Sequence, residues 1–182
     1  MSEITLILSS LKSSKGGASN DLLPLVYEEL RKLAAAKLAH ERVGQTLQPT
    51  ALAHEAFLRL VDAPCQKDWE SRNHFFAAAA EAMRRILVEA ARRKKCLKHG
   101  GGLQREELAE VAVPDSDDRL LELDEAMLRL AAEDPVAARV MELRHFGGLG
   151  HAGIALELGI TTYQARQKWS YARAWLREYL TE

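Results

Sequence analysis

Residues 143–175, LRHFGGLGHAGIALELGITTYQARQKWSYARAW, predict two short helices joined by a tight turn. The first helix is expected over 152–158. Gly159 follows it and can adopt the left-handed backbone that ends a helix, which other residues adopt only at a steric cost. Thr161 or Thr162 can then cap the second helix with its hydroxyl. The stretch is therefore predicted to be a helix-turn-helix.

The second helix is expected to present a polar, basic face. Its inward positions are the apolar Ala165, Trp169, Ala172 and Leu176. Its outward positions are Tyr163, Gln164, Arg166, Gln167, Lys168 and Arg173. Glutamine, arginine and lysine near the start of a helix can hydrogen-bond to base edges in a major groove, and no acidic residue lies between Thr161 and Arg177. DNA is the expected partner; the alternative is an ordinary helical hairpin with a solvated basic face.

Composition favours an all-α protein in the cytoplasm. The 182 residues are 47% hydrophobic and only 6% aromatic, and Ala, Leu, Glu and Arg dominate. No apolar run reaches the roughly 18 residues that span a bilayer. The first 17 residues lack the basic segment and cleavage site of a signal peptide. The cysteines, Cys65 and Cys96, do not form a disulfide framework, so we expect a cytoplasmic chain without membrane insertion.

The net charge of −1 conceals a strong segregation of charge along the chain. Residues 84–98 contain seven Lys or Arg and one acid, whereas residues 106–125 contain nine acids and one Arg. The basic segment suits a nucleic-acid partner. The acidic segment is expected to be a solvated linker, with the alternative that it shields the basic surfaces when DNA is absent.

Residues 99–118, HGGGLQREELAEVAVPDSDD, divide the chain. Three glycines, a proline and clustered Asp and Ser favour a flexible linker. The expected organisation is an N-terminal extension over 1–19, a helical domain over 20–98, this linker, and a helix-turn-helix domain over 119–182. The predicted fold class is therefore all-α, with two small helical domains joined by a flexible linker.

Three helices are predicted in the first domain. The first carries apolar residues at spacings of four, four and three, namely Leu22, Val26, Leu30 and Leu33. The second begins at Pro49 and Thr50. A polar loop over 62–73 precedes a long helix over 74–95, which is basic at its end. The phenylalanines Phe57, Phe75 and Phe76 are expected in the core.

The sequence lacks recognisable catalytic and metal-binding motifs. His54-Glu55 is not followed by the second histidine of a zinc-protease helix. Cys96 and His99 have the spacing of two zinc ligands, but no second pair follows. The glycine run after His99 lacks the Lys-Ser/Thr of a phosphate-binding loop, and no nucleophile elbow is present. We expect no catalytic residue, metal or cofactor.

The order of these segments resembles bacterial sigma factors of the extracytoplasmic-function (ECF) class, within the sigma-70 family. The segments that carry the resemblance are LLPLVYEELRKLA, TALAHEAFLRLVD, HFFAAAAEAMRRILVEAARRKK and the terminal ARVMELRHFGGL…LGI…W…ARAWL. It covers about residues 21–180 and implies a transcription initiation factor whose partners are core RNA polymerase and promoter DNA. An anti-sigma factor or other regulator is a further implied partner. The alternative is a helix-turn-helix regulator that acts without core polymerase.

The resemblance also implies roles for single residues in the first domain. The helix TALAHEAFLRLVD would dock on the clamp helices of the largest polymerase subunit through Glu55, Arg59 and Asp62. The loop over 62–73 would capture an unstacked base of the −10 element, by stacking and hydrogen bonds from Trp69, Arg72 and Asn73. The phosphates beside it would be held by Arg84, Arg85, Arg92, Arg93, Lys94 and Lys95.

In the second domain, the resemblance assigns recognition of the −35 element to one helix. Its implied DNA-binding residues are Thr162, Tyr163, Gln164, Arg166, Gln167, Lys168 and Arg173. The chain departs from the family where Ala78-Ala79 replaces a usual Trp-Leu. It also departs where the helix-turn-helix usually opens with Ser or Thr and paired acids, since this chain has Gly150, Ala152 and Gly153 there. A glycine inside a helix costs roughly 1 kcal/mol relative to alanine. Because of these departures, the promoter sequence that the chain reads does not follow from the resemblance.

Several of these residues also have simpler interpretations. Glu55 and Arg59 are spaced to form a surface ion pair on one helix. Trp69 is equally consistent with a loop anchor that packs on the first domain. The basic run over 92–95 suits a helix C-terminus, where cations favour the helix dipole, although four consecutive bases exceed that need.

Overall fold

The computed structural model describes residues 18–38, 47–61, 71–100 and 116–181, which form seven helices and no strand. The helices are α2 (Ala18–Leu38), α3 (Pro49–Val61), α4 (Arg72–Gly100), α5 (Ser116–Glu133), α6 (Pro135–His145), α7 (His151–Leu158) and α8 (Thr162–Tyr179). The predicted all-α fold is confirmed. Within these ranges no helix is both long enough and apolar enough to cross a membrane.

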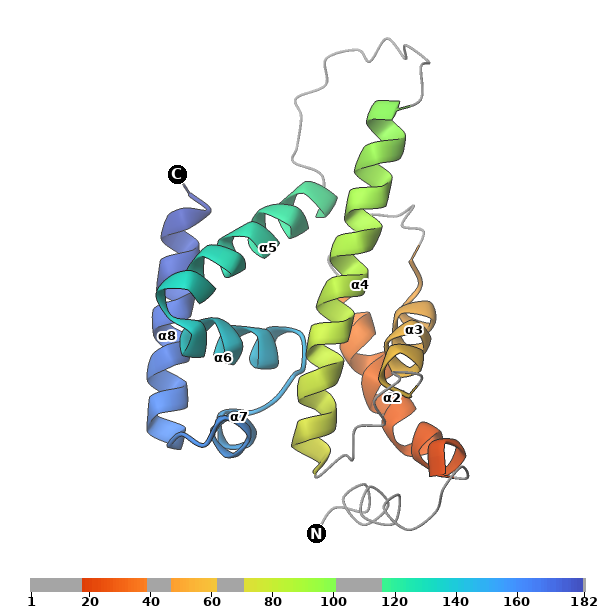
Figure 1. The fold of residues 1–182 in the computed structure, drawn as a ribbon, viewed down its shortest axis with the longest axis horizontal. Helices are drawn as coiled ribbons and strands as arrows, with labels where there is room; N and C mark the ends of the chain where they lie inside the picture. Colours follow the sequence, from red (N-terminus) through yellow and green to blue (C-terminus); the bar gives the residue numbers. More distant parts are fainter. Residues whose placement is uncertain (1–17, 39–46, 62–70, 101–115, 182) are drawn as a thin grey trace.

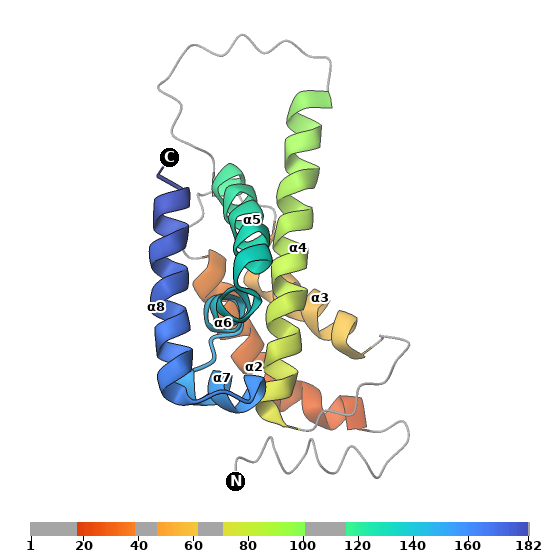
Figure 2. The ribbon, with the colours of Figure 1, turned by 60° about the vertical axis from the view of Figure 1, so that its left-hand side comes forward.

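Helix α4 runs through the middle of the molecule (Figure 1). On one side it packs against α3, which in turn packs against α2. On the other side it contacts α5, α6 and α7. Helix α8 lies on the outer side of these three helices, away from α4 (Figure 2). The helices before and after residues 101–115 are therefore in direct contact along α4.

A continuous cluster of buried apolar side chains joins both sides of α4. The expected core phenylalanines Phe57, Phe75 and Phe76 are only 5%, 0% and 2% exposed, which confirms that prediction. On the other side, Leu130 and Leu143 are fully buried. Each such side chain contributes roughly 1.5–3 kcal/mol by leaving water, so apolar burial is the main source of cohesion.

The predicted helix boundaries hold at α3 and shift at α4 and α5. Helix α3 begins at Pro49 as predicted, because proline lacks the N–H that a first helical turn leaves unpaired. Helix α4 begins earlier, at Arg72, where the Ser71 hydroxyl accepts a hydrogen bond from the His74 N–H at 3.0 Å. It continues to Gly100, and α5 begins at Ser116. Both ends of the segment predicted as a linker are thus helical, and its middle lies outside the described residues.

Candidate nucleic-acid interface

The polar face of α3 carries an ion-pair network that extends to α4. The Arg59 guanidinium donates hydrogen bonds to Glu55 Oε1 at 2.8 Å and to Glu89 Oε2 at 2.6 Å. The hydrogen bond from Arg59 lowers the pKa of the Glu89 carboxyl below its ordinary value. All three side chains remain at least one-third exposed, so they are accessible to a partner. The simpler pairing of Glu55 with Arg59 is therefore present, and Asp62 lies outside the described residues.

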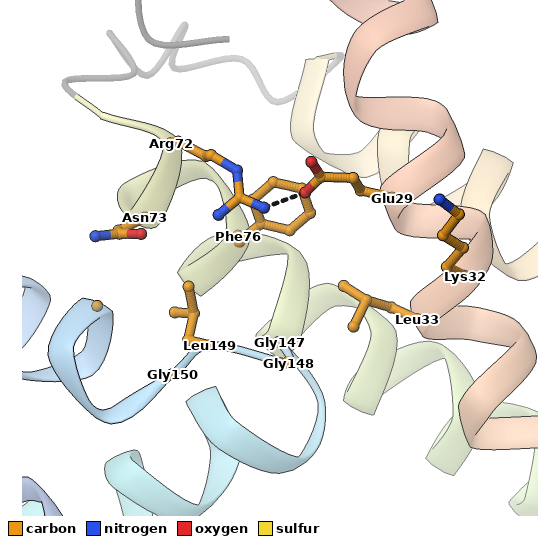
Figure 3. A pocket seen from close by; sticks show the side chains of 11 residues that line it. Glu29, Lys32, Leu33, Arg72, Asn73, Phe76, Gly147, Gly148, Leu149 and Gly150 are labelled. Carbon is orange, nitrogen blue, oxygen red and sulfur yellow. Dashed lines mark hydrogen bonds and ion pairs between the residues drawn. The ribbon is translucent and has the colours of Figure 1, made fainter. Parts of the chain in front are cut away.

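Two residues expected at the −10 element open α4 beside a cavity. Arg72 forms an ion pair with Glu29 of α2, and its guanidinium carbon lies 4.7 Å from the Phe76 ring centroid. Arg72 and Asn73 line a cavity of about 440 Å³, together with α2 and the loop between α6 and α7 (Figure 3). Trp69 lies outside the described residues. Arg72 is therefore held by an acidic and an aromatic side chain at once.

The basic face of α4 meets acidic residues from the C-terminal helices. Arg84 donates to Asp124 Oδ1 of α5 at 2.9 Å and to Glu142 Oε1 of α6 at 3.2 Å. The side chains of Arg84, Asp124 and Glu142 are only 16%, 11% and 10% exposed. Its neighbour Arg85 pairs with Glu81 of the same helix and is 68% exposed. Of the two adjacent arginines, Arg84 is therefore mostly buried between two acids, whereas Arg85 is exposed to solvent.

The end of α4 continues this pattern. Arg92 pairs with Asp124 at 3.3 Å, and Lys94 pairs with Asp117 at 3.2 Å. Lys95 pairs with Asp118 at 3.0 Å. Arg93 is exposed on the other side of this run, near Glu89. The acidic first turn of α5, together with Asp124, thus neutralises most of the cations that were expected to hold DNA phosphates.

Helices α7 and α8 follow one another through a short turn at the place where the sequence predicted a helix-turn-helix. Gly159 ends α7 with φ 65°, the left-handed conformation that the sequence predicted. Thr161 is the N-cap of α8: its hydroxyl accepts from the Gln164 N–H at 3.1 Å, and the Gln164 side chain accepts from the Thr161 N–H at 2.8 Å. This reciprocal capping box sets where α8 begins. The inward Ala165, Ala172 and Leu176 are buried, and Trp169 is half-buried.

The outer face of α8 separates residues that are free to contact DNA from residues that hold the helix. Tyr163, Arg166 and Gln167 are exposed, and the Gln167 amide donates to Tyr163 Oη at 2.9 Å. The Gln164 oxygen is occupied by the cap. Thr162 is half-buried in the first turn of α8. Arg173 is exposed two turns beyond Arg166, with its guanidinium carbon 5.8 Å from the Trp169 ring centroid.

Lys168 connects α8 to the start of α6. Its ammonium group forms an ion pair with Asp134, which is also the N-cap of α6 and accepts from the Ala137 N–H at 2.9 Å. Although partial burial alone raises the pKa of Asp134, the Lys168 ammonium and the Ala137 N–H together lower it. Asp134 is a positioning residue that the sequence interpretation missed. Its only sequence signal was the Asp-Pro pair that opens α6.

Two places where the sequence departs from the family pattern, Ala78-Ala79 and Gly150, lie in α4 and at the start of α7. Ala79 is fully buried, and Phe76 is 2% exposed. In this arrangement Phe76 is a core residue whose ring supports Arg72, so it does not present an aromatic face to solvent. Gly150 is the N-cap of α7 without a side-chain cap, which is the consequence of lacking the usual Ser or Thr there.

Comparison with known families agrees with this arrangement of segments. The sequence model of the family described as "ECF sigma factor" matches residues 1–182 of the chain. The match therefore covers the helical first half, the basic helix α4 and the terminal helix-turn-helix together. No curated protein and no solved structure matches the chain.

Proposed function

The chain belongs to the ECF sigma factor family, and from this premise we propose how its residues divide the work of promoter recognition. As a member of that family it binds core RNA polymerase and directs it to specific promoters. This identity takes precedence over the alternative of a regulator that acts without polymerase. We propose that its role is binding alone, with no bond made or broken by its own residues.

The proposed division places polymerase contact and −10 recognition in a domain over 20–98 and −35 recognition in a domain over 119–182. The observation that carries it is the exposed Gln and Arg face of α8, at the end of a chain whose earlier helix α4 is basic. A pull-down of core polymerase by the full chain, followed by transcription from a promoter library, tests the function. Binding without promoter-specific transcription would contradict it.

For the first domain, we propose that Glu55, Arg59 and Asp62 contact the polymerase, of which Asp62 lies outside the described residues. Their network is accessible on the surface, and a charged rim of this kind sets the orientation and rate of association. Arg72, Asn73 and Trp69 are proposed for the −10 element. The cations that would hold its phosphates are Arg84, Arg85, Arg92, Arg93, Lys94 and Lys95.

For the second domain, we propose that Arg166 and Gln167 read bases while other residues of α8 hold its position. Gln and Arg carry the paired donors and acceptors that distinguish adenine and guanine. Tyr163 supports the base contact proposed for Gln167, because its hydroxyl oxygen accepts a hydrogen bond from the Gln167 amide. Gln164 and Lys168 are engaged by Thr161 and Asp134, so they are proposed mainly as anchors that also border the DNA. Thr162 and Arg173 complete the surface as phosphate contacts.

Neutralising the basic run of α4 is expected to weaken transcription at every responsive promoter. The variant changes Arg92, Arg93, Lys94 and Lys95 to glutamine. For holoenzyme bound to promoter DNA, log K falls with log salt, and each lost phosphate contact should make this negative slope shallower by roughly 0.7–0.9. A control that changes Arg119 and Arg129, both exposed on α5, should keep the slope. An unchanged slope in the α4 variant would contradict the proposal that this run contacts DNA phosphates.

Substitutions in α8 are expected to separate base reading from backbone contact. Arg166→Ala and Gln167→Ala should each relax preference at particular positions of the upstream element, by roughly 1–3 kcal/mol for a lost bidentate contact. Arg173→Ala serves as the comparison and should weaken binding about equally on all sequences. A promoter library transcribed by each mutant holoenzyme measures both effects. A uniform loss for Arg166→Ala, with preferences intact, would assign that residue to phosphate instead.

A further inference from the structure

The cavity in Figure 3 is large enough to hold a small molecule. It has a volume of about 440 Å³ and opens between α2, the start of α4 and the loop from α6 to α7. Glu29 and Lys32 line it from α2, Arg72 and Asn73 line it from α4, and the loop over 147–150 lies beneath them in this view. Small-molecule sites in proteins have volumes of roughly 300–1,000 Å³. The cavity is therefore of the size that holds a metabolite.

The cavity has a positive net charge and several hydrogen-bond donors that are not in use. Its charged residues are two cations, Lys32 and Arg72, and one acid, Glu29. Only one terminal nitrogen of the Arg72 guanidinium donates to Glu29, and the guanidinium has no other acceptor within the described residues. In the same part of the chain, the Lys32 ammonium has no ion pair and the Asn73 amide has no hydrogen bond. These groups suit an anion.

The start of α7 adds backbone donors to this cationic wall. Gly150 is the N-cap of α7 without a side-chain cap, and Gly150 and Gly153 both line the cavity. The first N–H groups of a helix have no partner within the helix, and its dipole favours an anion there. A β-carbon at position 150 would meet nothing within 4 Å, and one at position 153 would lie 3.3 Å from Asn73 Oδ1. The glycines therefore leave the start of α7 accessible beside Asn73.

The rest of the lining suits hydroxyl groups better than a flat aromatic base. The Glu29 carboxylate keeps lone pairs that Arg72 does not use, and the Asn73 amide can both donate and accept. Phe76 is the aromatic residue of the described lining, but it is only 2% exposed and its ring lies under the Arg72 guanidinium. A base would therefore have no open ring to stack on, whereas a sugar would find hydrogen-bond partners.

We propose that this cavity binds a small sugar phosphate. Arg72, Lys32 and the start of α7 surround the phosphate, and Glu29 and Asn73 bind the hydroxyl groups. A phosphate supplies the negative charge and the acceptor oxygens that these donors need.

Binding of the sugar phosphate is independent of the proposed function, whereas its effect on transcription rests on that function. Arg72 and Asn73 are the side chains proposed for the −10 element. A sugar phosphate and the promoter base would therefore compete for the same two side chains, and the ligand would lower transcription.

The first test titrates the full chain with matched ligands in a calorimeter. Glucose 6-phosphate and ribose 5-phosphate are the probes, and at least one of them should bind with a Kd of roughly 0.1–1 mM, as expected for ligands of this size. Inorganic phosphate should bind about tenfold more weakly, because it leaves the hydroxyl partners unused. Glucose and ribose should not bind. Equal affinity for inorganic phosphate would contradict the sugar, and equal affinity for the unphosphorylated sugars would contradict the anion site.

The second test changes neighbouring residues of α2 in pairs. Lys32→Gln should weaken binding of the sugar phosphate about tenfold, whereas Arg31→Gln removes the same charge from an exposed residue outside the cavity and should have little effect. Glu29→Gln should tighten binding severalfold, because it removes a negative charge and releases the Arg72 guanidinium. Its control is Glu28→Gln, which lies outside the cavity. Nonspecific attraction to the surface of α2 would instead give equal shifts within each pair.

The third test places a side-chain cap at the start of α7. Gly150→Asp and Gly150→Asn both supply the missing cap, so both should raise the melting temperature. Only the aspartate adds a negative charge, and it should bind the sugar phosphate at least about tenfold more weakly than the asparagine variant. Circular dichroism confirms that the helices are retained. Equal affinities of the two variants would contradict the contact with α7.

Absence of binding by both sugar phosphates, or equal shifts within the residue pairs of α2, would overturn the inference. Its effect is measured by incubating the chain with the bound probe before core polymerase and promoter DNA are added. The probe should lower transcription, and about tenfold more of it should be needed for the Lys32→Gln variant. Unchanged transcription despite binding would contradict only the competition. Absence of wild-type transcription without the probe would contradict the proposed function.

Discussion

Replacing Phe75 with alanine is expected to lower the free energy of unfolding by about 3–5 kcal/mol. Phe75 is fully buried in α4, and its ring packs edge-on against Phe76 with centroids 5.5 Å apart. The substitution removes the transfer free energy of the ring and leaves a cavity that the surrounding helices fill only in part. Urea unfolding followed by circular dichroism measures the loss, and a smaller midpoint concentration is expected.

Tyr171→Ala is the matched control for this truncation. Tyr171 is an aromatic residue of α8 with 43% of its surface exposed. Surface substitutions of this kind usually change stability by roughly 0.5 kcal/mol or less. If the two variants unfolded at the same urea concentration, Phe75 would not be part of the core that joins α4 to its neighbours.

Reversing one charge on α3 is expected to weaken polymerase binding strongly while the chain stays folded. Glu55→Lys places a cation beside Arg59 and reverses the charge offered to the partner. Like charges brought together in an interface cost several kcal/mol, and a loss of about 3 kcal/mol corresponds to roughly a hundredfold weaker Kd. Within the free chain, an exposed pair of this kind contributes only about 0–1 kcal/mol. Titration of core polymerase with labelled chain measures the affinity.

Glu125→Lys provides the control for this charge reversal. Glu125 and Arg129 form the same type of pair, four residues apart on one helix, with side chains 62% and 60% exposed. This pair lies on α5, away from the proposed polymerase surface. Its reversal should leave the affinity within about twofold of the wild type, which is less than 0.5 kcal/mol. Unchanged affinity of the Glu55→Lys variant would remove α3 from the interface.

The local features of the fold could be predicted from the sequence. Pro49 opens α3, Gly159 closes α7 and Thr161 caps α8, as expected from the backbone preferences of these residues. The buried face of α8 followed from its apolar spacing. These signals are readable because each depends on residues within a few positions of one another.

Boundaries were less predictable where a helix is supported from elsewhere in the fold. Helix α4 runs to Gly100, and α5 begins at Ser116, although glycines and clustered Asp and Ser predicted a linker there. Lys94 and Lys95, near the end of α4, pair with the first-turn acids of α5. Contacts between these helix ends oppose fraying, and the first-turn acids also suit the dipole of α5. Propensity alone does not include such support.

The sequence by itself determined the helices, the helix-turn-helix, the charge segregation and the resemblance to ECF sigma factors. Only the tertiary structure decided which charges meet: Arg84 with Asp124 and Glu142, and Lys168 with Asp134. The physical reason is that an ion pair depends on the distance between two side chains, and residues 34–58 positions apart acquire that distance only when the helices pack. Sequence shows that the basic and acidic segments exist, whereas packing determines that one covers the other.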